Sequence, residues 1–400
     1  MITFGRNMKS KSIYLLIFLF FSCWKGHGQI LSDSTTLSVL TMGPDQAELY
    51  SAFGHSAIRV FDAKNNWDFV YNYGIFDFDQ PNFYLNFAQG KLYYMLGVQP
   101  YDRFDRAYRR NNRSIIEQVL NLDSVQKQQL FAYLQWNAQP ENRNYYYNYI
   151  YDNCATKIRD VLDTVFEGMV EYDYSYVTQD LTFRDLMDIY LPEQPWGDLG
   201  IDICLGIGID KTATGFHYMY LPDYIEKAMD GATIKYNGAT KPLISEKRII
   251  YQSKPEASQA STITPQITFI VVFLFFGFIS FKDLKRGQRS NWVDVTIFSV
   301  VGILGWLLLF LWFLTDHISQ YNFNLLWAIP AHFPIALFLL KKQKPGFIKV
   351  YFMGTAMILG ILIAIWGFWP QNLHDSLIPL TLLLLVRSIL IFRDLSQEVS

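Results

Sequence analysis

The chain has 400 residues, of which 51% are hydrophobic and 17% aromatic, and its formal net charge is only -2. This near-neutral balance gives no electrostatic reason to expect nucleic acid or another polyanion as a partner. Long uncharged runs, nearly all of them after Thr262, instead predict a membrane domain beside at least one soluble domain, so membrane lipids are the expected partners.

The N-terminus has the pattern of a secretory signal peptide. Basic side chains precede an apolar stretch at residues 13–21, and small residues follow it up to Gly28. We expect cleavage after Gly28, so that residues 1–28 are removed and residues 29–252 work outside the cytoplasm. A lipidated Cys23 and an uncleaved membrane anchor are the alternatives.

Residues 253–262 are polar, have no periodic apolar face and are predicted to be a linker. Residues 263–400 then form the predicted membrane domain, with five apolar runs long enough, or nearly so, to cross a bilayer. The runs cover residues 263–281, 295–314, 323–340, 350–369 and 373–392. Pro330, His332 and Pro334 interrupt the third run, although prolines are tolerated inside a helix bundle.

The loop charges predict the orientation of these five transmembrane helices. Basic residues follow the first, third and fifth runs: Lys282, Lys285, Arg286, Arg289, Lys341, Lys342, Lys344, Lys349, Arg387 and Arg393. The two other loops, around residues 316–320 and 370–375, contain no lysine or arginine. By the positive-inside rule the C-terminus is cytoplasmic and the N-terminal domain lies outside. The signal peptide requires the same topology, that of a multi-pass protein of the bacterial cytoplasmic (inner) membrane with a periplasmic domain.

The exported domain shows signals for both strands and helices. Residues 55–61 and 67–75 are rich in strand-forming residues, and the turn-like segment 62–66 between them predicts a β-hairpin. Residues 124–137 and 154–167 are predicted helices, and the apolar residues of the second recur at helical spacing. The fold class that we expect is therefore α+β.

His55 at the start of the first strand and Cys154 at the start of the second helix have the residue types of a thiol active site. Unpaired N–H groups and the helix dipole in a first helical turn stabilise a thiolate, lower its pKa and can hold an oxyanion. Asn153 is the predicted N-cap and a candidate oxyanion residue. Pairing across the hairpin places Asn72 or Tyr73 opposite His55, where either could orient a catalytic base. A buried cysteine on an apolar helix face is otherwise most often plain packing.

Cys204 is the other cysteine of the exported domain. It lies in the alternating run 201–205, which predicts a core strand, so a disulfide with Cys154 is less expected but stays open. Asp202 and Asp210 surround glycines and are interpreted as turn residues. The sequence has no glycine-rich phosphate loop and no close cluster of histidines or cysteines, so we expect neither a cofactor nor a metal.

At a few short motifs the chain resembles the Lnb-type lipoprotein intramolecular transacylases. These motifs are Phe53-Gly54-His55, Tyr71-Asn72-Tyr73-Gly74, Asp152-Asn153-Cys154-Ala155-Thr156 and Trp196-Gly197 with the later Leu221-Pro222. The five apolar runs are similar to that family's membrane domain. The order of a histidine on a strand and then a cysteine at a helix start resembles the circularly permuted papain-like, or NlpC/P60-like, hydrolases and acyltransferases. The resemblance implies such a fold for residues 29–252, with Cys154 as nucleophile, His55 as base and no third catalytic residue matched.

The resemblance also implies an acyltransferase whose substrates are diacylglyceryl-modified lipoproteins. Cys154 would take one ester-linked acyl chain as a thioester, and the α-amine of the lipoprotein's N-terminal cysteine would accept it, leaving a lyso-lipoprotein. An exported cysteine peptidase or amidase acting on cell-wall peptides is the alternative enzyme, because the same residue pair cleaves amides. A non-catalytic binding module anchored in the membrane is the third hypothesis, and it predicts that Cys154 and His55 are dispensable.

A lipid substrate requires an active site at the headgroup level, because moving acyl chains into water costs about 0.8 kcal/mol per methylene. The tyrosine-rich stretch 145–151 and the outer ends of the spans are the expected borders of lipid access, since tyrosines favour the membrane interface. Packing in an aromatic core explains these tyrosines equally well. His332, an ionisable residue at membrane depth, is a candidate for the substrate path.

Overall fold

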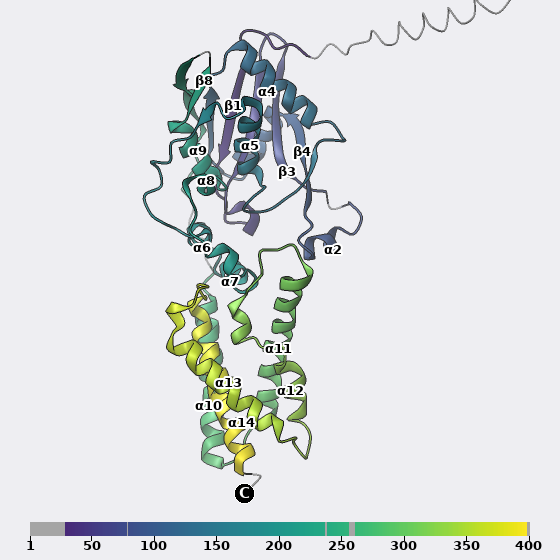
Figure 1. The fold of residues 1–400 in the computed structure, drawn as a ribbon, viewed down its shortest axis with the longest axis vertical. Coiled ribbons are helices and arrows are strands. Elements are labelled where there is room, and N and C mark those ends of the chain that lie inside the picture. Colours follow the sequence, from purple (N-terminus) through teal and green to yellow (C-terminus); the bar gives the residue numbers. More distant parts are fainter. Residues whose placement is uncertain (1–28, 78, 237, 256–260, 398–400) are drawn as a thin grey trace, which may run out of the picture.

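The protein consists of a sheet domain that stands on a bundle of membrane-type helices along the long axis of the molecule (Figure 1). The structure is a computed structural model, and it describes residues 29–77, 79–236, 238–255 and 261–397. The predicted signal peptide and the middle of the predicted linker lie outside the described residues.

The centre of the sheet domain is a seven-stranded antiparallel sheet. Its strand order is β10-β5-β1-β2-β3-β4-β6, so that β2 is the central strand and β3 lies beside it. The strands are β1 (Thr36–Met42), β2 (His55–Asp62), β3 (Trp67–Ile75), β4 (Tyr93–Pro100), β5 (Ile115–Leu120), β6 (Asn144–Tyr146) and β10 (Ile244–Tyr251). A second, three-stranded sheet contains β7 (Val170–Glu171), β8 (Thr233–Tyr236) and β9 (Ala239–Pro242).

Helices cover both faces of the large sheet, which gives the α+β fold expected from the sequence. The helices of this domain are α2 (Phe83–Ala88), α3 (Tyr101–Arg110), α4 (Ser124–Asn137), α5 (Cys154–Phe166), α6 (Phe183–Asp188), α7 (Pro195–Cys204), α8 (Gly215–Tyr218) and α9 (Pro222–Gly231). On one face, α4, α5 and α9 share a hydrophobic core through residues such as Leu134, Ile158 and Ile225. On the other face, Phe104 of α3 packs in a smaller core with Ala57 of β2.

Local sequence signals account for the elements that carry the predicted site. β2, β3, α4 and α5 begin and end within one residue of the predicted ranges, and β2 and β3 form the predicted hairpin. The prediction of a strand around Cys204 was wrong, because residues 195–204 form α7. Pro195 occupies the first helical position, where its missing N–H costs nothing. Alternation over only five residues does not distinguish a strand from a short helix.

Within the described residues 261–397, the bundle contains four helices long and apolar enough to cross a membrane. They are α10 (Pro265–Arg286), α11 (Asn291–Leu314), α13 (Phe347–Ala364) and the segment Asp375–Gln397, which includes α14 (Ile378–Gln397). Residues 323–340, the third of the five predicted spans, do not form one continuous helix. This run is divided into a 3-10 helix, η3 (Phe323–Leu326), and the short helix α12 (His332–Phe338). Pro330 lies between them, and a proline removes the N–H that a continuous helix would need.

The divided segment still returns the chain from one end of the bundle to the other. The end of α11 meets the sheet domain, where the N–H of Asp316 donates to the carbonyl of Gln89 at 2.8 Å. The loop after α13 also meets it, where Gln371 donates to the carbonyl of Leu205 at 3.0 Å. The chain must therefore pass away from the sheet domain through η3 and α12 before α13 begins (Figure 1).

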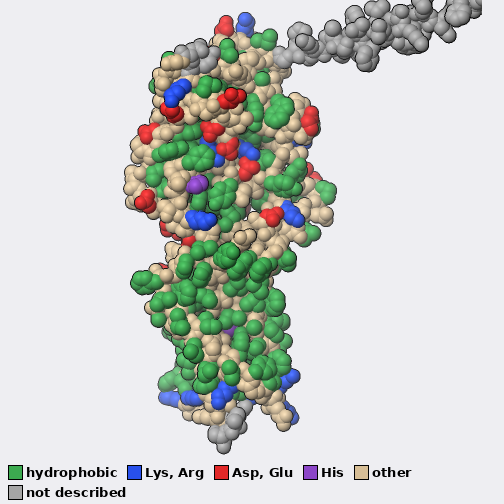
Figure 2. All heavy atoms as spheres, in the orientation of Figure 1, with side chains coloured by type: hydrophobic (Ala, Val, Ile, Leu, Met, Phe, Trp, Pro, Cys, Tyr) green, Lys and Arg blue, Asp and Glu red, His purple; other side chains and the backbone are tan. Residues whose placement is uncertain are grey.

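Basic side chains gather at the end of the bundle farthest from the sheet domain, and hydrophobic side chains cover its sides (Figure 2). Arg387, predicted from the sequence to be one of the loop charges, is instead fully buried in α14. Its guanidinium lies 2.6 Å from Asp294 and 2.8 Å from Asp283. Inside a bundle a charge must be paired in this way, because an unpaired buried ion is strongly destabilising.

Side-chain amides of the bundle attach the sheet domain by capping α7. Asn324 Nδ2 donates to the carbonyl of Asp202 at 2.8 Å, and Asn322 Nδ2 donates to the carbonyl of Ile203 at 2.7 Å. These carbonyls belong to the last turn of the helix, where helix geometry leaves them without an internal partner. The sheet domain is therefore attached to the bundle through the C-terminal end of α7.

Candidate active site

Cys154 is the first residue of α5, and Asn153 is the N-cap that places it there. The side-chain oxygen of Asn153 accepts hydrogen bonds from the N–H groups of Ala155 at 2.9 Å and Thr156 at 3.0 Å. The Thr156 hydroxyl in turn accepts from the Asn153 N–H at 2.7 Å, which completes a capping box. The Asn153 amide nitrogen donates to two backbone carbonyls, at 2.9 Å each. Both N–H groups of the Asn153 side-chain amide are thus used in hydrogen bonds, and the side chain has no donor left for an oxyanion.

The thiol of Cys154 lies where β2 and β3 separate. The two strands are paired between Asp62 and Ile58 of β2, and beyond Ile58 the backbone N–H of Ser56 donates to the Cys154 sulfur instead. Gly74, in the irregular part of β3, has φ of +92°, and a Cβ there would lie 3.9 Å from the Cβ of Cys154. The bend in β3 at this glycine therefore leaves room for the start of α5.

His55, the first residue of β2, forms a side-chain hydrogen bond with Cys154. Its Nε2 donates to Oδ1 of Asn72 on β3 at 2.6 Å, so Nδ1 is the ring nitrogen available to the sulfur. The imidazole also stacks on Tyr108 of α3, with ring centroids 6.3 Å apart and planes inclined by 11°. The ring is therefore held at one edge by an amide and on one face by an aromatic ring.

The structure distinguishes the two residues that the sequence left open as partners of His55. The β2–β3 register places neither residue directly opposite His55. Asn72 lies on the same face of the sheet as His55, two positions along β3 from the point opposite His55. Tyr73 points to the other face, where its hydroxyl donates to Asn137 of α4 at 2.6 Å. Tyr73 is a core residue, and of the two alternatives that the sequence left open, Asn72 is the one that contacts the imidazole.

The contacts between these side chains favour a thiolate–imidazolium pair. Burial alone would raise the pKa of the Cys154 thiol, but the charge and hydrogen bond of His55, with two backbone N–H groups, lower that pKa below its ordinary value. Burial alone would lower the pKa of His55, whereas the Cys154 thiolate and the hydrogen bonds to Cys154 and Asn72 raise it. Both shifts favour the form in which the proton is on the ring and the sulfur is a thiolate nucleophile.

Ser56, Tyr108 and Arg113 also surround the pair, and none of them was predicted from the sequence. Arg113 is buried, its Nε donates to the carbonyl of Gly43 at 2.8 Å, and its guanidinium carbon lies 4.8 Å from the centre of the Tyr108 ring. Its positive charge opposes protonation of His55. No sequence motif marks these residues, because Ser56 acts through its backbone, and Tyr108 and Arg113 reach the site only in the folded chain.

Both cysteines of the sheet domain, Cys154 and Cys204, are free thiols. The disulfide that the sequence left open is therefore not formed in this structure. Burial raises the pKa of Cys204, in the opposite direction to the shift at Cys154. The two thiols thus provide an internal comparison between a cysteine with a basic partner and one that is only buried.

The tyrosine-rich stretch divides between the core and the junction with the bundle. Tyr145 packs edge-on against Tyr73, with ring centroids 6.2 Å apart. The hydroxyl of Tyr149 accepts a hydrogen bond from the N–H of Ile318, in the loop after α11, at 3.3 Å. Tyr146 is 68% exposed. Core packing therefore describes one part of this stretch, and contact with the bundle describes another.

His332, the ionisable residue of the divided third run, lies at the start of α12. It is fully buried, and its Nδ1 is 2.6 Å from the hydroxyl of Tyr351 on α13. Its ring also packs edge-on against Phe298 of α11, with ring centroids 5.0 Å apart. These contacts give His332 a role in joining three helices of the bundle.

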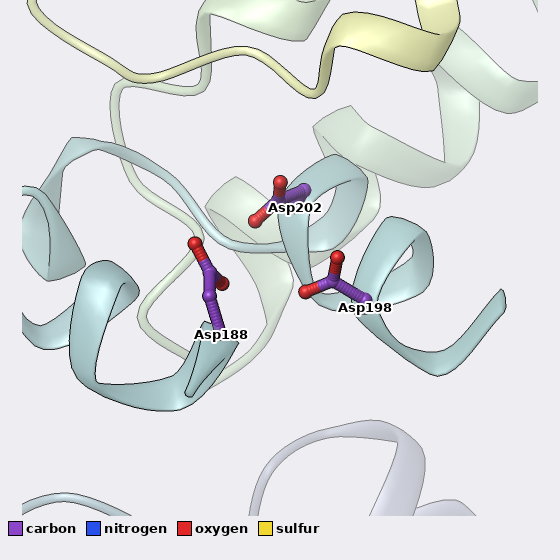
Figure 3. Close-up of side chains that lie close together, drawn as sticks. All are labelled: Asp188, Asp198 and Asp202. Atoms are coloured by element: carbon purple, nitrogen blue, oxygen red, sulfur yellow. The ribbon is translucent and has the colours of Figure 1, made fainter. Parts of the chain in front are cut away.

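A second group of ionisable residues lies at the junction of the two parts. The carboxylates of Asp188, Asp198 and Asp202 come within 4.8 Å of one another (Figure 3). Arg184 lies 2.5 Å from Asp202, and His374 lies 3.4 Å from Asp198. Burial, followed by the charges of the neighbouring carboxylates, raises the pKa of Asp188 to about 8. The cluster therefore holds a proton at neutral pH.

The interpretation of Asp202 and Asp210 as turn residues was wrong for Asp202 and incomplete for Asp210. Asp202 lies within α7, and both carboxylates pair with Arg184, at 2.5 Å and 2.9 Å. Arg184 is fully buried, so these partners are needed to offset its lost hydration. Asp210 also accepts from the N–H of Asn372 in the bundle at 2.9 Å, which makes it a second attachment between the two parts.

Two family models match the chain, one for each part of the molecule. Residues 24–187 match the Lnb N-terminal periplasmic domain, and residues 257–398 match the Lnb transmembrane domain. The chain belongs to the Lnb family. No curated protein and no solved structure gave a match.

Membership of the Lnb family makes the chain a multi-pass inner-membrane protein with a periplasmic N-terminal domain, and indicates an enzyme of lipoprotein modification. The residues that meet at the thiol, His55, Asn72 and Cys154, all lie within the matched Lnb periplasmic domain. The carboxylate cluster begins at Asp188, immediately after that match. It belongs to the segment that connects the two Lnb domains.

Proposed function

We propose that this Lnb protein is a lipoprotein N-acyltransferase that moves an ester-linked acyl chain of the diacylglyceryl group to the α-amine of the same lipoprotein. A thioester on Cys154 is the intermediate. The observation that carries this proposal is the His55 imidazole, which forms hydrogen bonds with both the Cys154 thiol and Asn72. This site lies in a periplasmic domain attached to the outer end of a membrane bundle. Cys154, His55 and the two ends of the substrate account for every bond and proton in the scheme.

In the first step the Cys154 thiolate attacks the carbonyl carbon of one glyceryl ester. The bond from that carbon to the glycerol oxygen breaks, and the imidazolium of His55 gives its proton to the departing oxygen. The N–H groups of Ala155 and Thr156 already bond the side chain of Asn153, so we assign the N–H of Cys154 to the oxyanion. The products are an acyl thioester and a neutral imidazole.

In the second step the α-amine of the lipoprotein's N-terminal cysteine attacks the thioester carbonyl. His55 takes one proton from the amine, and Cys154 leaves as a thiolate, which restores the starting ion pair. An amide is more stable than a thioester, so the transfer proceeds without an external source of energy. The product is an N-acylated lipoprotein with one free glycerol hydroxyl.

The position of the sheet domain supports a substrate that stays in the membrane. The amide contacts at α7 hold the domain against the outer end of the bundle, so acyl chains need not leave the lipid completely. We assign the opposite end of the bundle and the C-terminus to the cytoplasm, because basic side chains gather there (Figure 2). The thiol then faces the periplasm, where mature lipoproteins expose their N-terminal cysteine.

We also propose that the sheet domain is a circularly permuted papain-like, or NlpC/P60-like, domain. The order along the chain supports this assignment, since the histidine strand β2 precedes the cysteine helix α5. Asn72 on the neighbouring strand supplies the third member of a Cys-His-Asn set. The same set cleaves amides, so a cell-wall peptidase is the competing activity for the experiment below.

Mass spectrometry of a lipoprotein N-terminus from cells tests the proposed function. Wild-type protein is expected to move one acyl chain from oxygen to nitrogen, whereas Cys154→Ser should leave a diacylglyceryl group and a free amine. Cys204→Ser is the matched control and should behave like wild type. Acyl transfer that persists with Cys154→Ser would reject the thioester. Unchanged lipoproteins together with altered cell-wall peptides would favour the peptidase.

A further inference from the structure

The short helix α2 (Phe83–Ala88) has no part in the chemistry proposed above, yet it presents a large apolar surface. Tyr84 is 79% exposed, Leu85 56% and Phe87 50%. The surrounding segment, residues 80–90, contains no aspartate, glutamate, lysine or arginine. Large apolar side chains that gather on a surface without charges mark a contact with another apolar phase or partner.

The loop after α11 fixes α2 at the outer end of the bundle. The N–H of Asp316, two residues after α11, donates to the carbonyl of Gln89 at 2.8 Å. The His317 ring hydrogen-bonds to the backbone of α2. Gly90 lies so close to this loop that a Cβ would sit 2.8 Å from the backbone nitrogen of His317. α2 is therefore held at the level where α11 ends (Figure 1).

The end of α11 has the composition of a membrane interface. The Trp312 ring lies 5.1 Å from the Phe313 ring and 5.3 Å from the Tyr321 ring, and Phe313 and Tyr321 are exposed. Tryptophan and tyrosine concentrate at the headgroup level of a bilayer. Since α2 is tied to this segment by backbone contacts, its exposed side chains lie at the same depth. The outer leaflet is thus the apolar phase beside α2.

A series of contacting aromatic rings, which we call the aromatic ladder, connects α2 to the thiol. Its members are Phe83, Phe76, Tyr94 and Tyr147, with successive ring centroids 6.1, 5.2 and 4.5 Å apart. The last ring is next to the nucleophile, because a Cβ at Gly74 would be 3.8 Å from Tyr147 and 3.9 Å from Cys154. Each ring of the ladder is only half-buried, so part of its surface stays accessible.

We propose that α2 inserts its exposed side into the outer leaflet and that the aromatic ladder guides an acyl chain of the substrate from the leaflet to Cys154. The insertion stands on the position and composition of α2 alone. The guiding role rests on the proposed acyl transfer. An acyl chain that follows the ladder keeps its methylenes against apolar rings, so it reaches the thiol without crossing water.

Fluorescence quenching tests the insertion on the full chain in nanodiscs whose lipids carry a nitroxide near the top of the acyl chain. All native cysteines are replaced by serine, and an NBD fluorophore is attached to Leu85→Cys. The control is Val125→Cys on α4, which is 57% exposed on a helix remote from the bundle (Figure 1). The nitroxide should remove most of the Leu85→Cys signal and leave the control unchanged. Equal responses would overturn the insertion, and this result does not depend on catalysis.

The guiding role is tested with the double variant Phe83→Ser and Phe76→Ser, the two ladder rings farthest from Cys154, against the control pair Val125→Ser and Trp136→Ser on α4. Transfer is measured on a long-chain lipopeptide in nanodiscs and on a short-chain soluble analogue. We expect the long-chain rate to fall about tenfold, as for the lost burial of one or two methylenes, with the short-chain rate unchanged. An equal loss on both substrates, or none on either, would overturn the guiding role. If the double variant does not fold, Phe83→Ser alone gives the same comparison.

If wild-type protein transfers neither substrate, the proposed acyl transfer fails and the guiding role fails with it. The quenching result would still decide whether α2 lies in the outer leaflet. The two failures are therefore distinguishable.

Discussion

Asn72 holds His55 by a hydrogen bond of 2.6 Å from Nε2 to Oδ1, and this bond determines which ring nitrogen faces Cys154. The amide oxygen can only accept, so it selects the ring form that carries a proton on Nε2. Nδ1 then exchanges a proton with the sulfur and, in the proposed mechanism, with the substrate. The neutral amide of Asn72 thus determines that proton transfers at the site use Nδ1 of His55.

Replacing Asn72 should therefore misorient the base without removing it. Asn72→Ala is expected to lower kcat roughly 100-fold, the usual effect of a reacting group displaced by about 1 Å, with little change in KM. Because the bond from Asn72 raises the pKa of His55, its loss should also move the alkaline limb of the pH–rate profile, where the imidazolium is lost, to lower pH. Tyr73→Phe is the matched control: it should retain activity and lose only about 1 kcal/mol of unfolding free energy with its hydrogen bond. Activity that is sensitive to Tyr73 and indifferent to Asn72 would reverse the assignment.

The two free thiols should differ in reactivity. His55 lowers the pKa of Cys154, whereas burial raises that of Cys204, and only the thiolate is alkylated. We expect iodoacetamide to modify Cys154 well below the pH at which it modifies Cys204. In His55→Ala the Cys154 profile should shift to higher pH, because the positive partner of the thiolate is gone. Peptide mass spectrometry across a pH series gives both profiles, and identical profiles would refute the ion pair.

The N-cap should matter for both stability and reactivity. Asn153→Ala removes the acceptor for two N–H groups and the donor for two carbonyls, and is expected to cost about 1–2 kcal/mol of unfolding free energy. Fraying of the first turn should also slow alkylation of Cys154. Asp123→Ala removes the equivalent cap from α4 and serves as the control, since it should lower stability without slowing alkylation. Thermal unfolding and alkylation rates of the two variants test this distinction.

The carboxylate cluster should make stability depend on pH at the junction. The folded-state pKa of Asp188, about 8, lies above the unfolded value of about 4, so the folded protein binds the extra proton between these pH values. The stabilisation that this extra proton on Asp188 gives is therefore present below about pH 4 and is lost progressively as the pH rises to about 8. Asp188→Asn should unfold at a higher temperature than wild type at pH 8.5, with a smaller difference at pH 5. The exposed Asp180→Asn is the control, and a stabilisation that is equal at both pH values would contradict this account.

The sequence predicted those parts of the structure that depend on local signals. The β2–β3 hairpin and α5 follow from strand-forming residues, a polar turn and an N-cap, all within short segments. The site pair His55 and Cys154 could be proposed because each residue begins a recognisable element. The family assignment followed from the same short motifs, and the two family matches confirm it.

Features that depend on tertiary contacts could not be predicted in this way. The choice between Asn72 and Tyr73 depends on how β2 and β3 separate, which a one-residue change in register would reverse. The division of residues 323–340 depends on packing against neighbouring helices, because prolines alone do not exclude a span. The burial of Arg387 depends on carboxylates contributed by α10 and α11.

Trapping the acyl-enzyme tests the central claim most directly. Purified protein in nanodiscs is mixed with a synthetic diacylglyceryl lipopeptide whose α-amine is acetylated, so that the second step is blocked. The intact-protein mass should rise by one acyl group, hydroxylamine should remove that group, and fragmentation should place it on Cys154. Transfer to an unblocked lipopeptide by a protein that never carries this acyl group would contradict the account.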